Sequence, residues 1–314
     1  MITFGPVPSR RLGRSLGVNH VPPKNCSYAC VYCQVGATDR MRIDRSRFLD
    51  PAEVVDAVAR RIASCREERE PVDFVTFVPD GEPTLDLHLG EEIRGVRTLG
   101  VPVAVITNGS LLWRPEVREE LSAADVVSVK VDAADERTWR DVNRPHGRLS
   151  FEAHLEGVRR FAREYGGELI TETMLVAGRN DGPDHVEAVA DLVSELSPAR
   201  AWLAAPIRPP AEPGVAPPDE ASLVRAHEIF RARVGEVELL IHEPEGSFGG
   251  GADPVADLLA ILAVHPMRDA AVRAYLSDAG ADPSTAERLV ARGRVVRVEH
   301  GGESYFCHRI HAES

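Results

Sequence analysis

Short apolar runs and longer amphipathic stretches alternate along about the first 240 residues of the chain. The apolar runs are hydrophobic on both faces, which is typical of strands in a parallel sheet that helices cover on both sides. These expected strands are residues 16–21, 72–78, 101–107, 126–132, 168–176, 201–206 and 237–242.

The amphipathic stretches between the strands have the periodicity of helices. The first has Asp50 as its expected N-cap and Pro51 at its first helical position. One helical crossover per strand, repeated about six times, predicts an α/β fold with an incomplete (β/α)6 TIM-type barrel. The expected helices are residues 51–69, 86–99, 115–122, 151–165, 183–196 and 219–234.

Two changes of composition divide the chain. Residues 206–218 contain six prolines and are typical of a stiff linker, whereas residues 246–254 are rich in glycine. Three short helices are expected next, at 254–264, 268–279 and 283–292, with a hairpin of 295–299 and 304–308 after them. We therefore expect a barrel over residues 1–245 and a small winged-helix-like domain over residues 255–314.

Composition and charge narrow the class of protein. The chain has 314 residues, 43% of them apolar, which excludes a disordered, collagen-like or disulfide-scaffold protein. The net charge of −12 argues against a broad nucleic-acid surface, although it leaves room for a local basic patch. The apolar run 258–264 is too short to span a membrane, and no apolar stretch follows Arg10 and Arg11 as a twin-arginine signal would require. We expect a cytoplasmic protein without membrane partners.

Three of the five cysteines, Cys26, Cys30 and Cys33, follow the first expected strand with the spacing Cys-x3-Cys-x2-Cys. Three thiolates can hold three irons of a [4Fe–4S] cluster and leave the fourth iron open for a non-protein ligand. The alternatives are three buried thiols or a zinc site, whose fourth ligand would be a distant histidine such as His20 or His88. The spacing and its position favour the cluster.

This motif, with the aromatic Tyr32 before the last cysteine, resembles the signature of the radical S-adenosylmethionine (SAM) superfamily. The resemblance implies that the open iron binds S-adenosylmethionine and that an external donor of the flavodoxin or ferredoxin type supplies one electron. It also implies reductive cleavage to a 5′-deoxyadenosyl radical, which abstracts hydrogen from a substrate.

Polar residues at the ends of later strands extend this picture. In the superfamily a Gly-Gly-Glu turn holds the methionine ammonium group, and Gly81-Glu82-Pro83 resembles it with Asp80 in place of the first glycine. Read alone, Gly81-Glu82-Pro83 and Thr107-Asn108-Gly109 are ordinary turns. Together, at the ends of neighbouring expected strands, they indicate cofactor binding at the barrel mouth. The further candidates for cofactor binding are Thr107, Asn108, Gly109, Ser128, Glu172, Arg179 and Asn180.

The order of these motifs resembles the wyosine-base-synthase-related branch of the superfamily, over about residues 4–210. The quoted segments are residues 8–17, Gly-Glu-Pro-Thr-Leu at 81–85, Thr-Asn-Gly, Asp132-Ala133, Asn143-Arg144-Pro145 and Asn180-Asp181. Wyosine synthases carry a second cluster on three further cysteines. Cys65 and Cys307 are isolated and cannot supply it, so the tRNA reaction of that branch is not implied.

The only two lysines, Lys24 and Lys130, both fall in the expected active site, and we predict catalytic roles for them. A lysine can bind a carboxylate or react as an amine when burial lowers its pKa. Arg10, Arg11 and Arg14 precede the first expected strand and either bind an anionic substrate or form a solvated loop.

The C-terminal segment contains five arginines interleaved with acidic residues, which weakens a DNA-binding surface. These arginines are Arg288, Arg292, Arg294, Arg297 and Arg309. The leading hypothesis is therefore a radical SAM enzyme acting on a small molecule or a peptide, with the C-terminal part as a cover or recognition element. The alternatives are a tRNA-modifying enzyme and an iron–sulfur transcriptional sensor.

Overall fold

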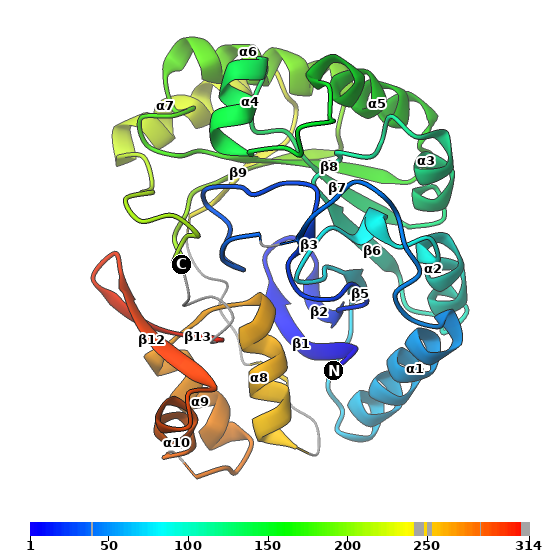
Figure 1. Cartoon of the computed structure of the whole chain (residues 1–314), viewed down its shortest axis with the longest axis vertical. Helices are drawn as coiled ribbons and strands as arrows, with labels where there is room; N and C mark the ends of the chain where they lie inside the picture. The colour runs from blue at the N-terminus through cyan, green and yellow to red at the C-terminus, as the bar shows by residue number, and fades with distance from the viewer. Residues whose placement is uncertain (39, 242–247, 250–252, 283, 309–314) are drawn as a thin grey trace.

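The computed structural model describes residues 1–38, 40–241, 248–249, 253–282 and 284–308. Its main feature is one sheet of eight strands that curls as an incomplete barrel, with helices on its outer side (Figure 1). All neighbouring strands are parallel except the first pair. The strands, in their order across the sheet, are β1 (Thr3–Ser9), β2 (Gly13–Val18), β5 (Phe74–Phe77), β6 (Val103–Thr107), β7 (Val126–Lys130), β8 (Glu168–Met174), β9 (Arg200–Ala204) and β10 (Val237–Leu240).

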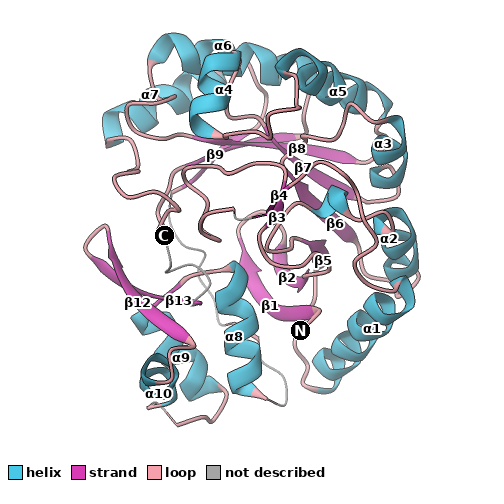
Figure 2. Cartoon of the chain, viewed as in Figure 1, coloured by secondary structure: helices cyan, strands magenta, loops and turns pink. Residues whose placement is uncertain are grey.

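The helices cross over between consecutive parallel strands, as the alternating pattern predicted (Figure 2). In the first helix the Asp50 side chain accepts a hydrogen bond of 2.8 Å from the N–H of Ala52, which confirms the expected N-cap. Val54, Val58 and Ile62 lie one turn apart on its buried face. These helices are α1 (Pro51–Glu67), α2 (Leu89–Arg97), α3 (Pro115–Leu121), α4 (Glu136–Val142), α5 (Phe151–Glu164), α6 (Pro183–Leu196) and α7 (Glu220–Arg231).

All seven expected barrel strands and all six expected helices are present, with shifted ends. The sequence reading missed β1 and α4, and it started β2 three residues too late. Pro6 and Pro8 disguise β1, because proline cannot donate to a sheet ladder. β1 tolerates both at the sheet edge, where its pairing with β2 is irregular between Phe4 and Val7.

Because β1 precedes them, Arg10, Arg11 and Arg14 do not lie before the first strand, where the sequence had predicted them. Arg10 and Arg11 lie in the turn between β1 and β2, whereas Arg14 is on β2 itself. The backbone N–H of Arg14 donates to Asp73 over 2.7 Å and its guanidinium pairs with Glu70 over 2.5 Å. Arg14 is therefore part of the sheet edge.

The C-terminal part contains the three expected helices and the expected hairpin. The short strand β11 (Met267–Arg268) was not expected, and it pairs with β13 to give a three-stranded sheet. Phe4 of β1 joins the apolar core of this part, so the missed strand is also its docking surface. The remaining elements are α8 (Pro254–Val264), α9 (Asp269–Asp278), α10 (Thr285–Ala291), β12 (Val295–His300) and β13 (Glu303–His308).

The proline-rich segment 206–218 has neither helix nor strand, as expected. Most of the glycine-rich segment 246–254, the end of the last expected barrel strand at 242 and Arg309 lie outside the described residues. No helix in the described part of the chain is long and apolar enough to cross a membrane.

Apolar side chains fill both sides of the curled sheet. The largest core lies between the sheet and the outer helices. A smaller cluster inside the barrel includes Leu12, Val126, Ile170 and Trp202, near the N-terminal ends of the parallel strands. The polar residues that point into the barrel therefore gather toward the opposite end, where the carboxyl ends of parallel strands usually form a site.

Candidate active site

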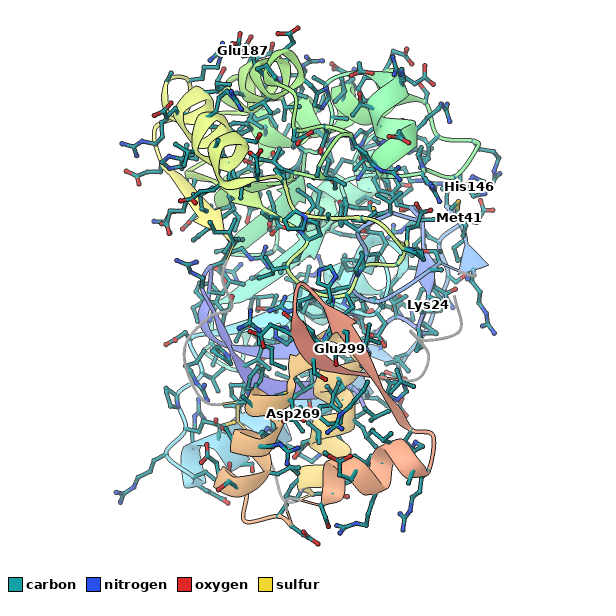
Figure 3. All side chains as sticks on the ribbon, turned by 90° about the vertical axis from the view of Figure 1, so that its left-hand side faces the viewer. Lys24, Met41, His146, Glu187, Asp269 and Glu299 are labelled. Carbon is teal, nitrogen blue, oxygen red and sulfur yellow. The ribbon has the colours of Figure 1, made fainter. Side chains whose placement is uncertain are left out.

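The three cysteines lie on one loop between β2 and α1. Cys26 ends the short strand β3 (Asn25–Cys26), which pairs with β4 (Arg40–Met41). The C-terminal end of α4 holds the middle of the cysteine loop. The N–H groups of Ala29 and Val31 donate to the carbonyls of Asn143 and Val142 over 3.2 Å and 3.0 Å. Figure 3 places Lys24, Met41 and His146 along the same side of the molecule, where this loop runs.

The three thiols form one electrostatic unit. Burial raises the pKa of Cys26 and Cys33, and it raises the pKa of Cys30 to about 12. A charge on Cys33 would further raise the pKa of the other two, and a cationic centre between the three sulfurs would oppose these shifts. The side-chain amides of Asn108 and Asn143 donate to Cys26 and Cys30, each over 3.6 Å. Such N–H donors suit sulfurs that carry charge, as ligands of a cluster do.

The other possible ligands considered from sequence are engaged elsewhere. Cys65 lies on α1 with its sulfur 3.8 Å from Glu70, and Cys307 is buried on β13. His88 faces the carbonyl of Leu49 over 3.0 Å. His20 lies 3.9 Å from Glu92 and belongs to a separate cluster described below. A three-thiol centre with an open position fits this arrangement better than a four-ligand zinc site.

The turn after β5 packs directly on the cysteine loop. The N–H of Lys24 donates to the carbonyl of Asp80, and the N–H of Glu82 donates to the carbonyl of Asn25, both over 3.0 Å. A Cβ atom on Gly81 would lie 2.0 Å from that same carbonyl oxygen, which no side chain can accommodate. The glycine is therefore needed for the backbone of this turn to approach the loop.

Glu82 joins this turn to the next one along the sheet. Its buried carboxylate accepts hydrogen bonds from the hydroxyls of Thr84 and Thr107 over 2.6 Å and 2.5 Å, and from the N–H of Asn108 over 2.8 Å. Burial raises the pKa of Glu82, while these donors oppose the shift. Pro83 opens the short helix η1 (Pro83–Leu85), and Gly109 has a φ of +71° in the second turn.

Tyr32 and Lys130 lie together at the inner side of the cysteine loop. The Tyr32 hydroxyl donates to Asp132, which also accepts from the Asn143 amide over 2.6 Å. The ammonium nitrogen of Lys130 lies 5.2 Å from the centre of the Tyr32 ring and pairs with Glu172. Burial lowers the pKa of Lys130, and the Asp132 carboxylate opposes this shift.

A cavity of about 320 Å³ opens beside Tyr32, Cys33 and Lys130. Glu172 pairs with both Arg11 and Lys130 at its wall. The wall also includes Arg10, Gln34, Arg208, Val264 and His265, together with apolar residues of β1, β6, β8, β9 and β10. Four cationic residues, Arg10, Arg11, Lys130 and Arg208, therefore line the described wall, and two of them pair with the carboxylate of Glu172.

The C-terminal part closes one side of this cavity. Arg208 donates to Gln34 over 3.0 Å and lies 3.1 Å from His265, while Gln34 donates to the carbonyl of Val264 over 3.0 Å. The Tyr305 hydroxyl donates to the carbonyl of Ile207 over 2.9 Å. Segments from the cysteine loop, the proline-rich segment and α8 thus meet at one edge of the cavity.

The remaining predicted residues lie at varied distances from this centre. Lys24 is buried below the cysteine loop, where its ammonium donates to the carbonyl of Val35. Ser128 is buried on β7, and Asn180 ties the loops after β7 and β8 by donating to the carbonyls of Asp132 and Met174 over 3.0 Å and 2.8 Å. Arg179 pairs with Asp141 and Glu212 and does not line the cavity.

Sequence reasoning did not select several residues of this site. Gln34, Arg208 and His265 reach the cavity from three segments far apart in the chain, and no local pattern marks them. Asn143 lay in a motif quoted for resemblance, but nothing in the sequence connected its amide to Cys30.

The chain is similar in sequence to known proteins. Residues 21–193 match the family model described as the radical SAM superfamily. A UPF0026 protein of Methanocaldococcus jannaschii is 40% identical over 311 residues, covering 98% of this chain and 96% of its own length. A UPF0026 protein of Synechocystis is 36% identical over 66% of this chain and 76% of its own.

Two solved structures share the fold. A radical SAM methyltransferase from Sphaerobacter thermophilus aligns over 72% of this chain and 66% of its own, with a TM-score of 0.54 and 20% identity. TYW1 with a bound lysine-pyruvate adduct aligns over 70% of this chain and 74% of its own, with a TM-score of 0.53 and 16% identity. At such identities these likenesses concern the fold alone.

Proposed function

The chain belongs to the radical SAM superfamily, and we propose that it uses one [4Fe–4S] cluster on Cys26, Cys30 and Cys33 to act on an anionic substrate. The superfamily uses a [4Fe–4S] cluster and S-adenosylmethionine. When bound, this pair supplies a 5′-deoxyadenosyl radical that abstracts a hydrogen atom from the substrate. One observation carries the proposal: three thiols share one loop, which packs on the Gly81 turn beside a charged cavity.

The residues around the cysteines have separate roles in this proposal. Asn108 and Asn143 donate hydrogen bonds to two of the ligand sulfurs, and Lys24 holds the end of the loop through Val35. Glu82 keeps the turns after β5 and β6 in one arrangement, so that their backbone groups can bind the cofactor. The predicted cofactor residues Thr107, Asn108 and Gly109 form the turn after β6, which Glu82 holds against the turn after β5.

The cavity favours a substrate with a carboxylate or phosphate group. Arg11 and Lys130 at its wall share Glu172, the one carboxylate among the described lining residues. Cations in a partly dry cavity bind anions more strongly than they would in water. The volume of about 320 Å³ suits a small molecule or a single peptide side chain beside the cofactor.

The C-terminal part acts in this proposal as a cover for the cavity. Its contacts run through Val264, His265 and Tyr305 to the cysteine loop and the proline-rich segment. On its hairpin and last helix, arginines form ion pairs with neighbouring carboxylates, such as Arg297 with Glu287 over 2.6 Å. Such pairing lowers the charge available for DNA phosphates, which disfavours the sensor alternative.

Anaerobic reconstitution tests the function. We expect a brown protein that releases 5′-deoxyadenosine when it is mixed with S-adenosylmethionine and a strong reductant or reduced flavodoxin. Alanine variants of Cys26, Cys30 or Cys33 should lose both the colour and the product, whereas Cys65→Ala is the matched control and should keep both. A colourless protein that binds one zinc ion through these thiols would contradict the proposal.

A further inference from the structure

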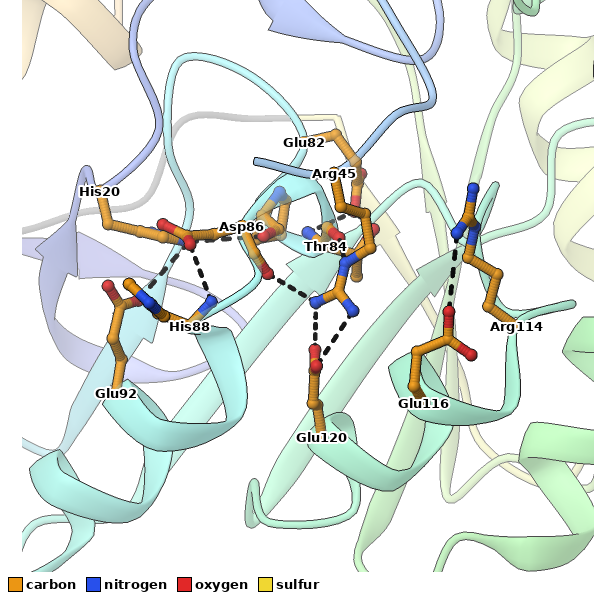
Figure 4. A network of polar contacts seen from close by, with 11 residues as sticks. His20, Arg45, Glu82, Thr84, Asp86, His88, Glu92, Arg114, Glu116 and Glu120 are labelled. Atoms are coloured by element: carbon orange, nitrogen blue, oxygen red, sulfur yellow. Dashed lines mark hydrogen bonds and ion pairs between the residues drawn. The ribbon is translucent and has the colours of Figure 1, made fainter. Parts of the chain in front are cut away.

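A second group of metal-ligating side chains lies behind the turn after β5. His20 follows β2, Asp86 follows η1, and Glu92 lies on the first half of α2 (Figure 4). One ligand atom from each residue lies within 4.8 Å of the other two. All three residues are buried, with at most 1% of their surface exposed, and none lines the cavity next to the cysteines.

Several polar atoms of this cluster lack hydrogen-bond partners among the described residues. They are both carboxylate oxygens of Glu92, Oδ2 of Asp86 and Nδ1 of His20. The other Asp86 oxygen accepts from the N–H of His88 over 2.8 Å. A buried carboxylate without a partner is strongly unfavourable, so a fully buried Glu92 in this state calls for a ligand.

We propose that His20, Asp86 and Glu92 bind one divalent cation, as a structural site separate from the cysteine centre. Nε2 of His20 faces the carbonyl of Pro83 over 3.4 Å and lies 3.9 Å from Oε2 of Glu92, which is too far for a hydrogen bond with the carboxylate. Two metal–ligand bonds of about 2.1 Å can bridge such a gap. A movement of about 1 Å by the third ligand completes the set, because no two of the ligand atoms are more than 4.8 Å apart.

The charges of the cluster suit this ligand. His20 is fully buried, and burial favours the neutral imidazole that can coordinate a metal. The two carboxylates then balance a charge of two. Nitrogen and oxygen donors of this kind select manganese, iron or zinc, and they differ from the thiolates of the cluster site.

A shared proton is the alternative occupant. Burial raises the pKa of Glu92 to about 9 and that of Asp86 to about 6, so without a metal Glu92 is the acid of this pair that holds a proton at neutral pH. However, a protonated Glu92 would still lack a hydrogen-bond partner among the described residues, and Nε2 of His20 lies 3.9 Å from its Oε2. Protonation removes the charge but leaves the Glu92 oxygens without partners, whereas a cation provides a partner for both carboxylates.

The position of the cluster indicates what the ion does. Asp86 and Glu82 flank η1, so the ion would hold the same turn that Glu82 fixes from the other side. Arg45 also fixes this turn, donating to the carbonyls of Thr84 and Asp86 over 2.8 Å and 2.5 Å (Figure 4). Its charge is balanced by Glu120, with which it forms two hydrogen bonds. The cation would thus join β2, η1 and α2 beneath the cofactor turn.

Metal analysis of the full-length chain tests the site with manganese as the probe. The protein is produced in medium supplemented with manganese chloride, dialysed against a chelator and analysed by plasma mass spectrometry. We expect about one manganese ion per chain in the wild type. His20→Ala and Glu92→Gln should lose it, whereas Glu91→Gln, an exposed neighbour on the same helix, should retain it.

Pulsed electron paramagnetic resonance provides a reading that does not depend on the folding of variants. Manganese in the wild-type protein should couple to the nitrogen of one imidazole, and the coupling should change in protein labelled with 15N-histidine. Metal loading should also raise the midpoint of thermal unfolding in the wild type but not in Glu92→Gln. Wild-type protein without bound manganese, zinc or extra iron, and less stable than Glu92→Gln, would show that a proton occupies the cluster and would overturn the proposal.

Discussion

The carboxylate of Glu82 accepts a hydrogen bond of 2.8 Å from the backbone N–H of Asn108. This contact joins the turn after β5 to the turn after β6, and the same Asn108 donates to the sulfur of Cys26 over 3.6 Å. Replacement of Glu82 by Gln puts a buried amide N–H₂ group, which is a donor, next to the Thr84 hydroxyl, the Thr107 hydroxyl and the Asn108 N–H, which are also donors. We expect Glu82→Gln to lower the free energy of unfolding by about 2 kcal/mol.

The same variant should bind S-adenosylmethionine at least about tenfold more weakly, which corresponds to about 1.4 kcal/mol. Chemical denaturation and equilibrium dialysis measure the two effects. Glu91→Gln, the same change at an exposed position of α2, is the control. Unchanged affinity in Glu82→Gln would show that the joined turns do not form the cofactor site.

The close approach of Gly81 to Asn25 gives a second prediction. Gly81→Ala places a methyl group 2.0 Å from the Asn25 carbonyl oxygen, so the turn and the cysteine loop must move apart. We expect a loss of about 1–3 kcal/mol in stability and a lower iron content after reconstitution. Gly166→Ala, where no atom lies within 4 Å of the new methyl group, should behave as wild type.

Lys130 lies between Tyr32, Glu172 and the cavity, and its replacement separates substrate chemistry from cofactor binding. Lys130→Arg keeps a positive charge but replaces a compact amine with a wide, permanently charged group. We expect the variant to keep its iron and its S-adenosylmethionine affinity while product formation falls at least about tenfold, or about 1.4 kcal/mol in barrier height. Product formation at the wild-type rate would exclude a catalytic role; Arg225→Lys on the exposed face of α7 is the control.

His154 makes the stability of the protein depend on pH. Its ring is buried, stacks on Trp139 and faces the carbonyl of Gly109, and burial lowers its pKa to about 4. The unfolded chain binds this proton near pH 6.5, so stability is full above that pH and is lost as the pH falls toward 4. We expect His154 to account for about 3 kcal/mol of that loss.

His154→Phe preserves the aromatic stack and should therefore have a flatter stability profile between pH 7 and pH 4. Denaturation at several pH values measures the difference between the variant and the wild type. His146→Phe, in a half-exposed loop, is the matched control. Parallel profiles for wild type and His154→Phe would contradict the prediction.

A substitution at Tyr305, which contacts Ile207, tests whether the C-terminal part covers the cavity. Tyr305→Phe removes a hydrogen bond of 2.9 Å to the proline-rich segment, at a cost of about 1 kcal/mol. If the C-terminal part shields the cavity, the cluster of this variant should bleach faster in air. Tyr275→Phe loses a comparable bond to Pro254 within the C-terminal part, and its cluster should bleach at the wild-type rate.

The local patterns of the sequence predicted most of the elements and the centre of the site. Strand and helix periodicity depends on neighbouring residues, so the seven parallel strands and their helices could be read directly. The three cysteines lie within eight residues, and their spacing and their position after the first expected strand favoured a shared cluster. The longest exceptions are β1 and α4: prolines disguise the first, and the second is only seven residues long. The other exceptions are β3, β4, β11 and η1, which are two or three residues long and too short to leave a periodic pattern.

What the sequence determined by itself is the set of periodic elements, the cysteine loop and the polar turns at strand ends, because each depends on residues close together in the chain. The tertiary structure decided which distant side chains meet. Strand pairing places Lys130 beside Glu172, while the β1–β2 turn adds Arg11 to the same wall. The tertiary structure also places Arg179 outside the cavity and brings His20, Asp86 and Glu92 together. Such contacts depend on the order of strands and the packing of helices, which no local spacing specifies.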